Sequence, residues 1–371
     1  MQGQWVGATE GDTIGNLIVD LDDEHNHFRG TARLFATGEP GIVCEIKTAD
    51  RSPKQQLDFV PLLWMPEGQP QIVTREVISD LLPDVSFPRT ADVTLELISK
   101  NELAVKWVSD VGTAGHASLI KSRAEDPSKL EPISEILTWK EFKDFGVSQE
   151  PGKFIFRGQP EAFKLRTAFH RTHRKDLVRF VAEDIPLARK LLTSQTKHLF
   201  DLSKPEQVGA FYNLLQHHGY PTPLLDWTYS PFVAAFFAYR RRPRDAPSDK
   251  VRIFVFDKAA WESDFRQLQA VNFAEHHFSI LDALAIENQR ATPQQALSTL
   301  TNVDDVESYI AFREKERGKT YLYAVDLPAD LRREVMVELS FMGITAGTLF
   351  PGLDGACEAL KGRLFHQQLA K

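Results

Sequence analysis

Apolar and polar residues alternate in the first part of the chain. Within residues 42–47, 93–98 and 103–107, apolar side chains recur at every second position. A period of two is typical of half-buried β-strands, because successive side chains of a strand point to opposite faces. Segments of this kind follow one another at short spacing, so residues 1–122 are predicted to form a small all-β sandwich or barrel domain. No catalytic constellation stands out within it.

A charged segment then interrupts the strand pattern. Residues 123–131 contain five charged side chains and one proline, and their apolar residues show no period. Such composition favours irregular structure. Residues 123–134 are therefore predicted to link the β-rich domain to a second domain over residues 135–371.

Strand and helix patterns are interleaved in this second region. Short apolar runs predict buried strands at residues 153–156, 251–256 and 321–325. Apolar residues three or four positions apart predict helices at residues 186–200, 208–215, 232–239 and 329–342. This mixture predicts an α+β (mixed α/β) domain.

Three short motifs carry signals for helix ends. Ser203 to Glu206 matches a capping box and predicts a helix start. Gly219 suits a helix end that needs a left-handed residue. Ser230, followed by a proline, predicts a second helix start with serine as the N-cap.

Composition narrows the function classes. The 371 residues are enough for two domains, and the net charge of -7 argues against a general nucleic-acid or membrane binder. The two cysteines, Cys44 and Cys357, are too few for a disulfide framework or a cysteine-based zinc site, and both are expected in cores. No stretch is typical of a signal peptide or membrane span, so a cytoplasmic location without a membrane partner is expected.

Arg157 is the first candidate for chemistry. It stands at the predicted exit of a buried strand and is followed by Gly158 and Gln159. A guanidinium at such a position can contact a phosphate or carboxylate through two hydrogen bonds. The alternative is a surface arginine, with Gly158 serving only the turn.

The segment from His217 to Ser230 is the second candidate. Asp226 and Thr228 would lie beside a helix N-terminus, where free N–H groups favour anions, and Trp227 would offer a flat ring to a base. The alternative has Thr228 and Ser230 only capping, Trp227 in the core, and Asp226 bonded to backbone.

Histidines and basic residues add further candidates. His218 would orient a pocket group or exchange a proton, or else cap a helix end. The neighbouring histidines lack the spacing of a metal-binding helix, so no metal site is predicted. Basic stretches occur at residues 166–179 and 239–244, and the second is typical of a solvated helix end. The alternative is that both receive phosphates or a nucleic acid, with Arg171 as the main candidate.

Several of these motifs together resemble the FRG domain family, named for its Phe-Arg-Gly motif. The motif stands at residues 156–158, and similar stretches follow at residues 165–171, 218–228 and 234–238. A weaker third block at residues 288–296 resembles the family's Asn-x-Arg…Gln-x-Gly segment, and residues 348–355 also look similar. Here Ala296 replaces the usual glycine, and Ser298 stands where an aromatic residue is common. The resemblance covers about residues 135–360.

FRG domains are similar to the ADP-ribosyltransferase superfamily, so the resemblance implies an ADP-ribosyltransferase-like fold that takes NAD as its substrate. Carried over, the nucleotide would be held by the first two motifs, through Arg157, Gln159, Arg171, His218, Trp227, Thr228 and Ser230. The catalytic group would comprise Arg157, Asp226, Thr228, and Gln294 or Gln295. Since cleavage of the NAD glycosidic bond develops oxocarbenium character, a carboxylate would help. In that superfamily the third element carries a glutamate or a glutamine. The third block here offers glutamine rather than glutamate, and Asp226, Glu275 or Glu287 would supply the carboxylate instead.

Three hypotheses follow. The first is an enzyme that transfers ADP-ribose from NAD to a protein or nucleic-acid acceptor, or hydrolyses NAD. Its β domain would recognise a target, partner or trigger, which would suit a bacterial toxin or phage-defence effector. The second is a non-catalytic nucleotide- or phosphate-binding module. The third is a scaffold in which Arg157 and Asp226 form a buried ion pair.

Overall fold

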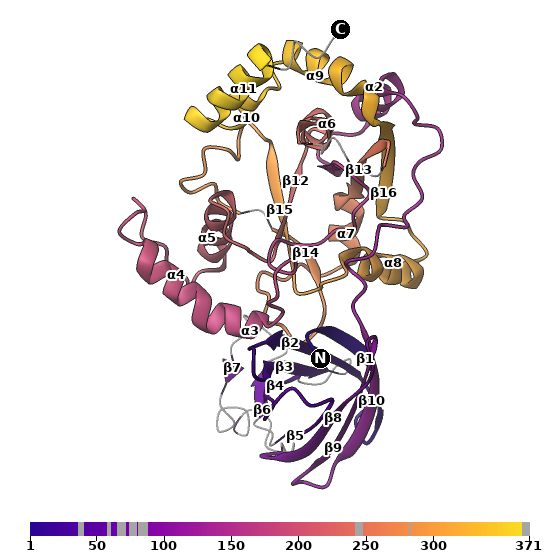
Figure 1. Ribbon diagram of the computed structural model, residues 1–371, viewed down its shortest axis with the longest axis vertical. Helices are drawn as coiled ribbons and strands as arrows, with labels where there is room; N and C mark the ends of the chain where they lie inside the picture. The colour runs from indigo at the N-terminus through magenta and orange to yellow at the C-terminus, as the bar shows by residue number, and fades with distance from the viewer. Residues whose placement is uncertain are drawn as a thin grey trace.

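The computed structural model describes residues 1–35, 41–57, 61–64, 72–73, 80, 88–241, 248–281 and 283–365, without the side chains of 61–64 and 72–73. A β-rich N-terminal region and a mixed C-terminal region lie end to end (Figure 1). No helix among the described residues is long and apolar enough to cross a bilayer.

The N-terminal strands form one antiparallel sheet, with the order β5-β8-β9-β10-β1-β2-β3-β4-β6-β7. They are β1 (Gly3–Gly11), β2 (Asn16–Asp23), β3 (Phe28–Phe35), β4 (Ile42–Lys47), β5 (Lys54–Leu57), β6 (Pro61–Trp64), β7 (Ile72–Val73), β8 (Ala91–Ser99), β9 (Glu102–Ser109) and β10 (Ala114–Lys121). The sheet curls into a nearly closed barrel-like shape (Figure 1), which we call the barrel. Its interior is apolar because alternate residues such as Trp5, Leu17 and Leu119 point inward and are buried. The predicted all-β, barrel-like fold of the N-terminal part is confirmed.

The C-terminal region contains a second antiparallel sheet with helices on both faces. Its strands are β11 (Phe154–Gln159), β12 (Leu224–Thr228), β13 (Lys250–Asp257), β14 (Phe278–Leu281), β15 (Ala296–Thr301) and β16 (Leu322–Pro328), in the order β14-β15-β12-β11-β13-β16. Its helices are α2 (Trp139–Ser148), α3 (Leu177–Arg179), the π-helix η1 (Phe180–Asp184), α4 (Ile185–Leu192), α5 (Pro205–His217), α6 (Pro231–Arg240), α7 (Lys258–Asp264), α8 (Val306–Arg317), the 3-10 helix η2 (Ala329–Leu331), α9 (Arg332–Phe341), α10 (Ala346–Leu349) and α11 (Leu353–Phe365). The mixed α+β class is confirmed.

Gly158 allows α6 to pack closely on β11. A Cβ atom at this position would lie 1.9 Å from the carbonyl oxygen of Ala234 and 2.7 Å from the amide nitrogen of Ala238. No side chain fits there, so the glycine of this motif serves helix–strand packing. The expectation that Gly158 serves only a turn is wrong, since the residue belongs to the strand.

The sheet divides between its two central strands. Strands β11 and β13 share six register pairs from Phe154 to Gln159, and β12 pairs with β15 over its whole length. By contrast, β11 and β12 share the single pair Phe156–Thr228. The two strands therefore diverge beyond that pair, and side chains rather than ladder hydrogen bonds fill the space between them.

Helix ends follow the sequence signals in part. Gly219 has a φ of 87° after α5, and the Ser230 hydroxyl accepts a hydrogen bond from the Val233 amide at the start of α6, so both signals are confirmed. The capping box at Ser203 is wrong, because the N-cap of α5 is Lys204 and the Ser203 hydroxyl instead donates to Asp201. A turn within the polar segment satisfies this serine better than the helix end does.

The cysteines differ from each other in their surroundings. Cys44 is buried in the barrel, as expected, whereas Cys357 is exposed. The expectation of a core position for Cys357 is wrong because α11 lies on the surface of the molecule, with Leu353 and Leu360 also exposed.

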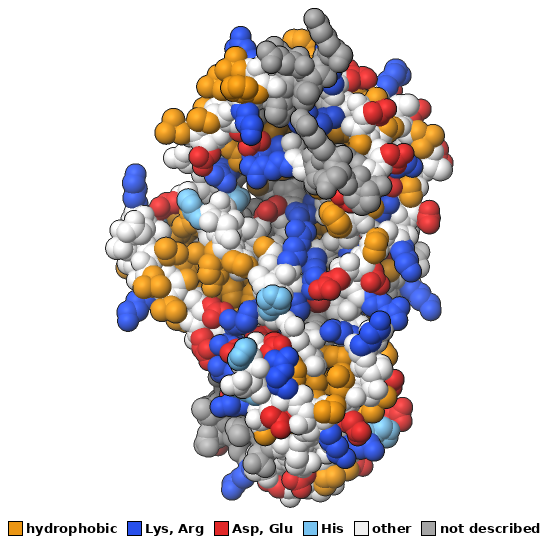
Figure 2. Space-filling view, viewed as in Figure 1, with side chains coloured by type: hydrophobic (Ala, Val, Ile, Leu, Met, Phe, Trp, Pro, Cys, Tyr) orange, Lys and Arg blue, Asp and Glu red, His pale blue; other side chains and the backbone are white. Residues whose placement is uncertain are grey.

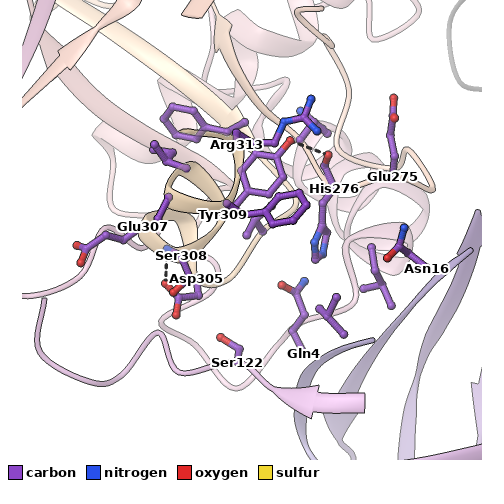
Figure 3. A pocket seen from close by; sticks show the side chains of 18 of the residues that line it. Gln4, Asn16, Ser122, Glu275, His276, Asp305, Glu307, Ser308, Tyr309 and Arg313 are labelled. Atoms are coloured by element: carbon purple, nitrogen blue, oxygen red, sulfur yellow. Dashed lines mark hydrogen bonds between the residues drawn. The ribbon is translucent and has the colours of Figure 1, made fainter. Parts of the chain in front are cut away.

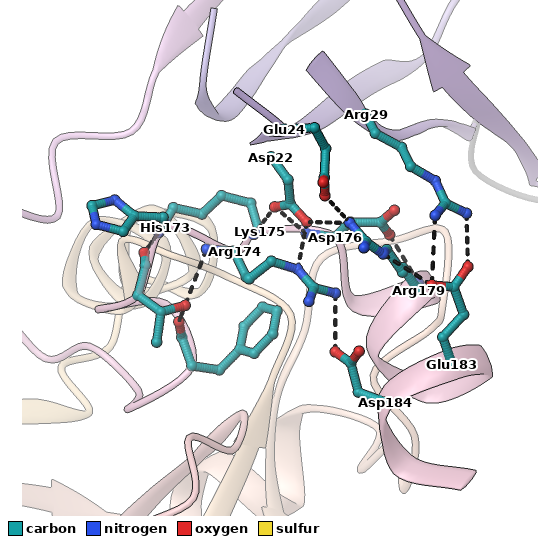
Figure 4. A network of polar contacts seen from close by, with 12 residues as sticks. Asp22, Glu24, Arg29, His173, Arg174, Lys175, Asp176, Arg179, Glu183 and Asp184 are labelled. Carbon is teal, nitrogen blue, oxygen red and sulfur yellow. Dashed lines mark hydrogen bonds and ion pairs between the residues drawn. The ribbon is translucent and has the colours of Figure 1, made fainter. Parts of the chain in front are cut away.

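Charged residues join the barrel to the C-terminal region (Figure 4). Asp22 of β2 pairs with Arg174 at 2.7 Å and accepts hydrogen bonds from the amides of Lys175 and Asp176. The pairs Glu24–Arg179 and Arg29–Glu183 extend the network to α3 and η1. The barrel thus contacts the second half of the basic stretch at residues 166–179, and Arg174 and Arg179 pair with its carboxylates.

Candidate functional site

Arg157 lies in the space where β11 and β12 diverge. It is half-buried, and its Nη1 donates a hydrogen bond of 2.6 Å to the carbonyl oxygen of Asp226. Its Nε is buried and has no partner within the described part of the chain. Burial lowers the pKa of Arg157 to about 10; Asp226 opposes this effect and Arg171 adds to it. Arg157 therefore remains charged at neutral pH, and its Nε can still donate a hydrogen bond.

Asp226 presents its carboxylate to solvent next to this guanidinium. Its Oδ1 accepts a hydrogen bond of 2.5 Å from Gln216 of α5, and the Gln216 side-chain oxygen accepts one from the Thr222 hydroxyl. The described residues give Oδ2 no partner. Gln216 thus fixes one oxygen of the carboxylate and leaves the other available.

The third sequence block meets α5 beside Asp226. Asn288 donates to the side-chain oxygen of Asn213 at 2.7 Å, and Arg290 donates to the carbonyl oxygen of His217 at 3.2 Å. Asn213 in turn donates to Ser298, which pairs with Asp226 across β12 and β15. We call this set the Arg157–Asp226 cluster; it comprises Arg157, Arg171, Asn213, Gln216, His217, Asp226, Asn288, Arg290 and Ser298.

The cluster combines positive charge with a histidine that favours its neutral form. Burial lowers the pKa of His217 below its ordinary value, although Asp226 acts in the opposite direction. Burial and the charge of Arg166 lower the pKa of Arg171. Figure 2 shows Lys and Arg side chains gathered over the central strands of this region. Such a surface attracts an anion.

Three of the predicted site residues serve the fold. Trp227 is 2% exposed, and its indole packs against Phe256 and donates to the Thr299 hydroxyl, so the expectation of an open ring face is wrong. The Thr228 hydroxyl donates to the carbonyl oxygen of Gln294 at 2.7 Å and is buried. Ser230 caps α6. Within strand β12, Asp226 is exposed, whereas its two chain neighbours, Leu225 and Trp227, are buried.

The two glutamines of the third block differ in their surroundings. Gln294 is buried and donates to the carbonyl oxygen of Leu349, while Gln295 is exposed with a φ of 46°. Gln159, at the end of β11, donates to the carbonyl oxygen of Phe163. The contacts of Gln294 and Gln159 therefore fix a loop and a strand end in place.

The remaining candidates lie apart from one another. His218 is exposed at the end of α5. Glu287 accepts a hydrogen bond from the His198 amide, and Glu275 lies near the barrel, on a cavity whose lining includes no residue of the Arg157–Asp226 cluster. Of the three carboxylates considered as substitutes for the missing glutamate, Asp226 is the one beside Arg157. The proposed buried ion pair is absent from the described contacts, because Arg157 contacts the backbone of Asp226 rather than its carboxylate.

Sequence reasoning missed several polar residues of the cluster. Asn213 and Gln216 of α5 were missed; they lie four and one positions before His217, which belongs to the second candidate segment, and this spacing places Asn213 and His217 on one face. Asn288 and Arg290 belong to the third block, which was noted for its glutamines. The signal in the sequence was therefore the spacing of the polar residues on α5, which predicts that they share one face of the helix.

The arrangement suits an anionic, hydroxyl-rich ligand. Arginine can bind phosphate through two hydrogen bonds, and amide side chains can bind hydroxyl groups. Asp226 could stabilise positive charge that develops on a ligand. Within the described residues, no group of three or more histidines, cysteines and acidic residues could hold a metal ion.

Comparison with known families identifies this part of the chain. Residues 152–246 match the FRG domain family model, a span that contains β11, α5, β12 and α6. The chain thus contains an FRG domain, with its Phe-Arg-Gly motif on β11. No curated protein matches the chain. A solved structure of a redesigned beta barrel matches 33% of this chain and 91% of its own at 10% identity, but its TM-score of 0.24 is too low to carry an argument.

Proposed function

We propose that the FRG domain binds NAD at the Arg157–Asp226 cluster and cleaves its bond between ribose and nicotinamide. The observation that carries this proposal is the solvent-facing carboxylate of Asp226, held by Gln216 beside the half-buried guanidinium of Arg157. Arg157 and Arg171 would bind the pyrophosphate, and the amides of Asn213 and Asn288 would bind ribose hydroxyls.

The reaction would use the charge of Asp226. As the bond from C1′ to the nicotinamide nitrogen breaks, its electron pair leaves with nicotinamide, and positive charge develops on the ribose. The Asp226 carboxylate would stabilise this charge. Water or a nucleophile of a macromolecular acceptor then bonds to C1′ and loses its proton, so the domain acts as an NAD glycohydrolase or an ADP-ribosyltransferase. A barrel that recognises the acceptor would suit a toxin or phage-defence effector.

Nicotinamide release from NAD by the purified protein tests this proposal, with and without cell lysate as a source of acceptors. Asp226→Asn keeps the shape and the hydrogen bond from Gln216 but removes the charge, and should lower the rate by about a hundredfold or more. Asp92→Asn, an exposed aspartate on β8, is the matched control and should leave the rate unchanged. Equal rates for all three proteins would contradict the role of Asp226.

A second candidate function is nucleotide binding without cleavage. The contact of Gln294 supports it, because the amide of this residue is bonded to the carbonyl oxygen of Leu349. Saturable NAD binding in the absence of nicotinamide release, under both conditions, would select this function over the first.

A further inference from the structure

A cavity of about 1700 Å³ lies between the barrel and the C-terminal region (Figure 3). One wall is the outer face of the barrel at β1, β2 and β10. The opposite wall is formed by α8 and the segment that leads into β14. Its volume exceeds that of an ordinary small-molecule pocket. The cavity is separate from the site proposed for NAD, since no residue of the Arg157–Asp226 cluster lines it.

The barrel wall is an apolar row with a polar end. Val6 pairs with Ile120 on one side and with Ile18 on the other, so the three side chains form a ladder across neighbouring strands. They face outward because the alternate residues, such as Trp5, fill the barrel interior. Asn16, two positions before Ile18, lies on the same face and is exposed. Ile18 is fully buried, so the accessible part of the ladder is Val6 and Ile120. A flat apolar ring would fit against these two side chains, with the Asn16 amide at its edge.

The opposite wall offers aromatic rings and an uncharged imidazole. The Tyr309 hydroxyl of α8 donates to the backbone carbonyl oxygen of His276 at 3.1 Å, and the two rings lie edge to face with centroids 6.3 Å apart. In Figure 3 the His276 ring points between α8 and the barrel strands, toward Gln4. Burial lowers the pKa of His276 well below its ordinary range, so the ring is neutral at neutral pH.

Buried polar atoms without partners gather around this cavity. Within the described residues, unpartnered atoms occur on four of its lining side chains, namely His276, His277, Glu307 and Arg313. Buried polar groups without a partner are rare in folded proteins and call for an explanation such as an absent ligand. A ligand with both donors and acceptors would supply hydrogen bonds here.

The charges of the lining are balanced. Its basic side chains belong to Lys121, Arg123, Lys129, Lys164, Arg266 and Arg313, and its acidic ones to Asp126, Glu275, Asp305, Glu307, Glu314 and Glu316. Equal numbers of the two signs give no net attraction for a phosphate or for a cation. This lining therefore differs from the arginine-rich Arg157–Asp226 cluster and favours an uncharged ligand.

We propose that the interdomain cavity binds the base of an uncharged nucleoside. The ring would lie between Tyr309 and the Val6–Ile120 ladder, and its polar edge would bond to His276 Nε2 and the Asn16 amide. Asparagine is suited to this contact because its amide offers a donor and an acceptor side by side. The ligand would touch both domains and so stabilise their contact, and this role does not depend on the NAD site.

Calorimetric titration of the full chain with adenosine, guanosine, cytidine and uridine tests the proposal. At least one nucleoside should bind with one-to-one stoichiometry. Asn16→Ala, an exposed substitution that leaves the barrel core intact, should weaken that binding by about tenfold. Asn101→Ala, in the exposed turn between β8 and β9, is the matched control and should bind as the unmodified protein does.

Two further variants locate the site. His276→Leu should also lose affinity, whereas Arg157→Ala should retain it, because the two sites are separate. The proposal is overturned if no nucleoside binds, if Asn16→Ala and His276→Leu both bind normally, or if Arg157→Ala alone abolishes binding.

Discussion

Asp176 should make the stability of this protein depend on pH in an unusual direction. The residue is 2% exposed and caps α3, and its Oδ1 accepts hydrogen bonds from the amides of Val178 and Arg179. Burial raises the pKa of its carboxyl from 3.8 to about 7, with further contributions from Asp22 and Asp20 of the barrel. The charged form is therefore costly in the folded protein.

The size and sign of the effect follow from these two pKa values. The folded state keeps the proton up to about pH 7, whereas an unfolded aspartate loses it near 3.8. Folding thus takes up a proton between these values, and stability falls as the pH rises through that window. A shift of about three units corresponds to about 4 kcal/mol, lost between roughly pH 4 and pH 8.

Asp176→Asn isolates this contribution. Asparagine keeps the side-chain oxygen that caps α3 but cannot ionise. Urea unfolding at intervals from pH 4.5 to pH 8 should show the variant gaining stability over the unmodified protein as the pH rises, by a few kcal/mol in all. Asp257→Asn, at the N-cap of α7, controls for replacing a capping aspartate. Parallel stability curves for Asp176→Asn and the unmodified protein would refute this reasoning.

Two further predictions concern packing and the barrel contact. Gly158→Ala should destabilise the protein by about 3 kcal/mol or more in urea unfolding, because its Cβ would meet the Ala234 carbonyl at 1.9 Å, whereas Gly362→Ala, with open space, should be neutral or stabilising. A small loss at position 158 would mean that α6 can move away. Asp22→Ala should cost about 2–5 kcal/mol, since it leaves the amides of Lys175 and Asp176 without their buried acceptor, while Arg174 keeps only its second partner, Asp184. Unchanged stability would show that the barrel contact is not held by this carboxylate.

Local sequence signals predicted much of the fold. Period-two patterns located three strands of the barrel, β4, β8 and β9, and Gly219 and Ser230 marked helix ends that the backbone adopts. The helix-end signals are reliable because the backbone preference of a single residue, such as a glycine with positive φ or a capping serine, decides where the helix begins or ends. Ser203 failed because Asp201 offers its hydroxyl a competing acceptor.

The site was harder to predict, since its geometry depends on how strands pair. The divergence of β11 and β12 places Arg157 against the backbone of Asp226, and strand parity turns Trp227 inward. Neither follows from spacing along the chain. The Arg157 and Asp226 motifs were recognised from sequence, whereas the amides of α5 became part of the cluster only through tertiary packing.

Direct titration of the purified protein with NAD tests the central claim that the Arg157–Asp226 cluster is a nucleotide site. We predict saturable binding that Arg157→Ala weakens by about a hundredfold, and that Asp226→Asn largely preserves because it keeps the arginine. Unfolding curves for both variants would establish that they are folded. Equal NAD affinity in folded Arg157→Ala and the unmodified protein, or no binding by either, would contradict the account.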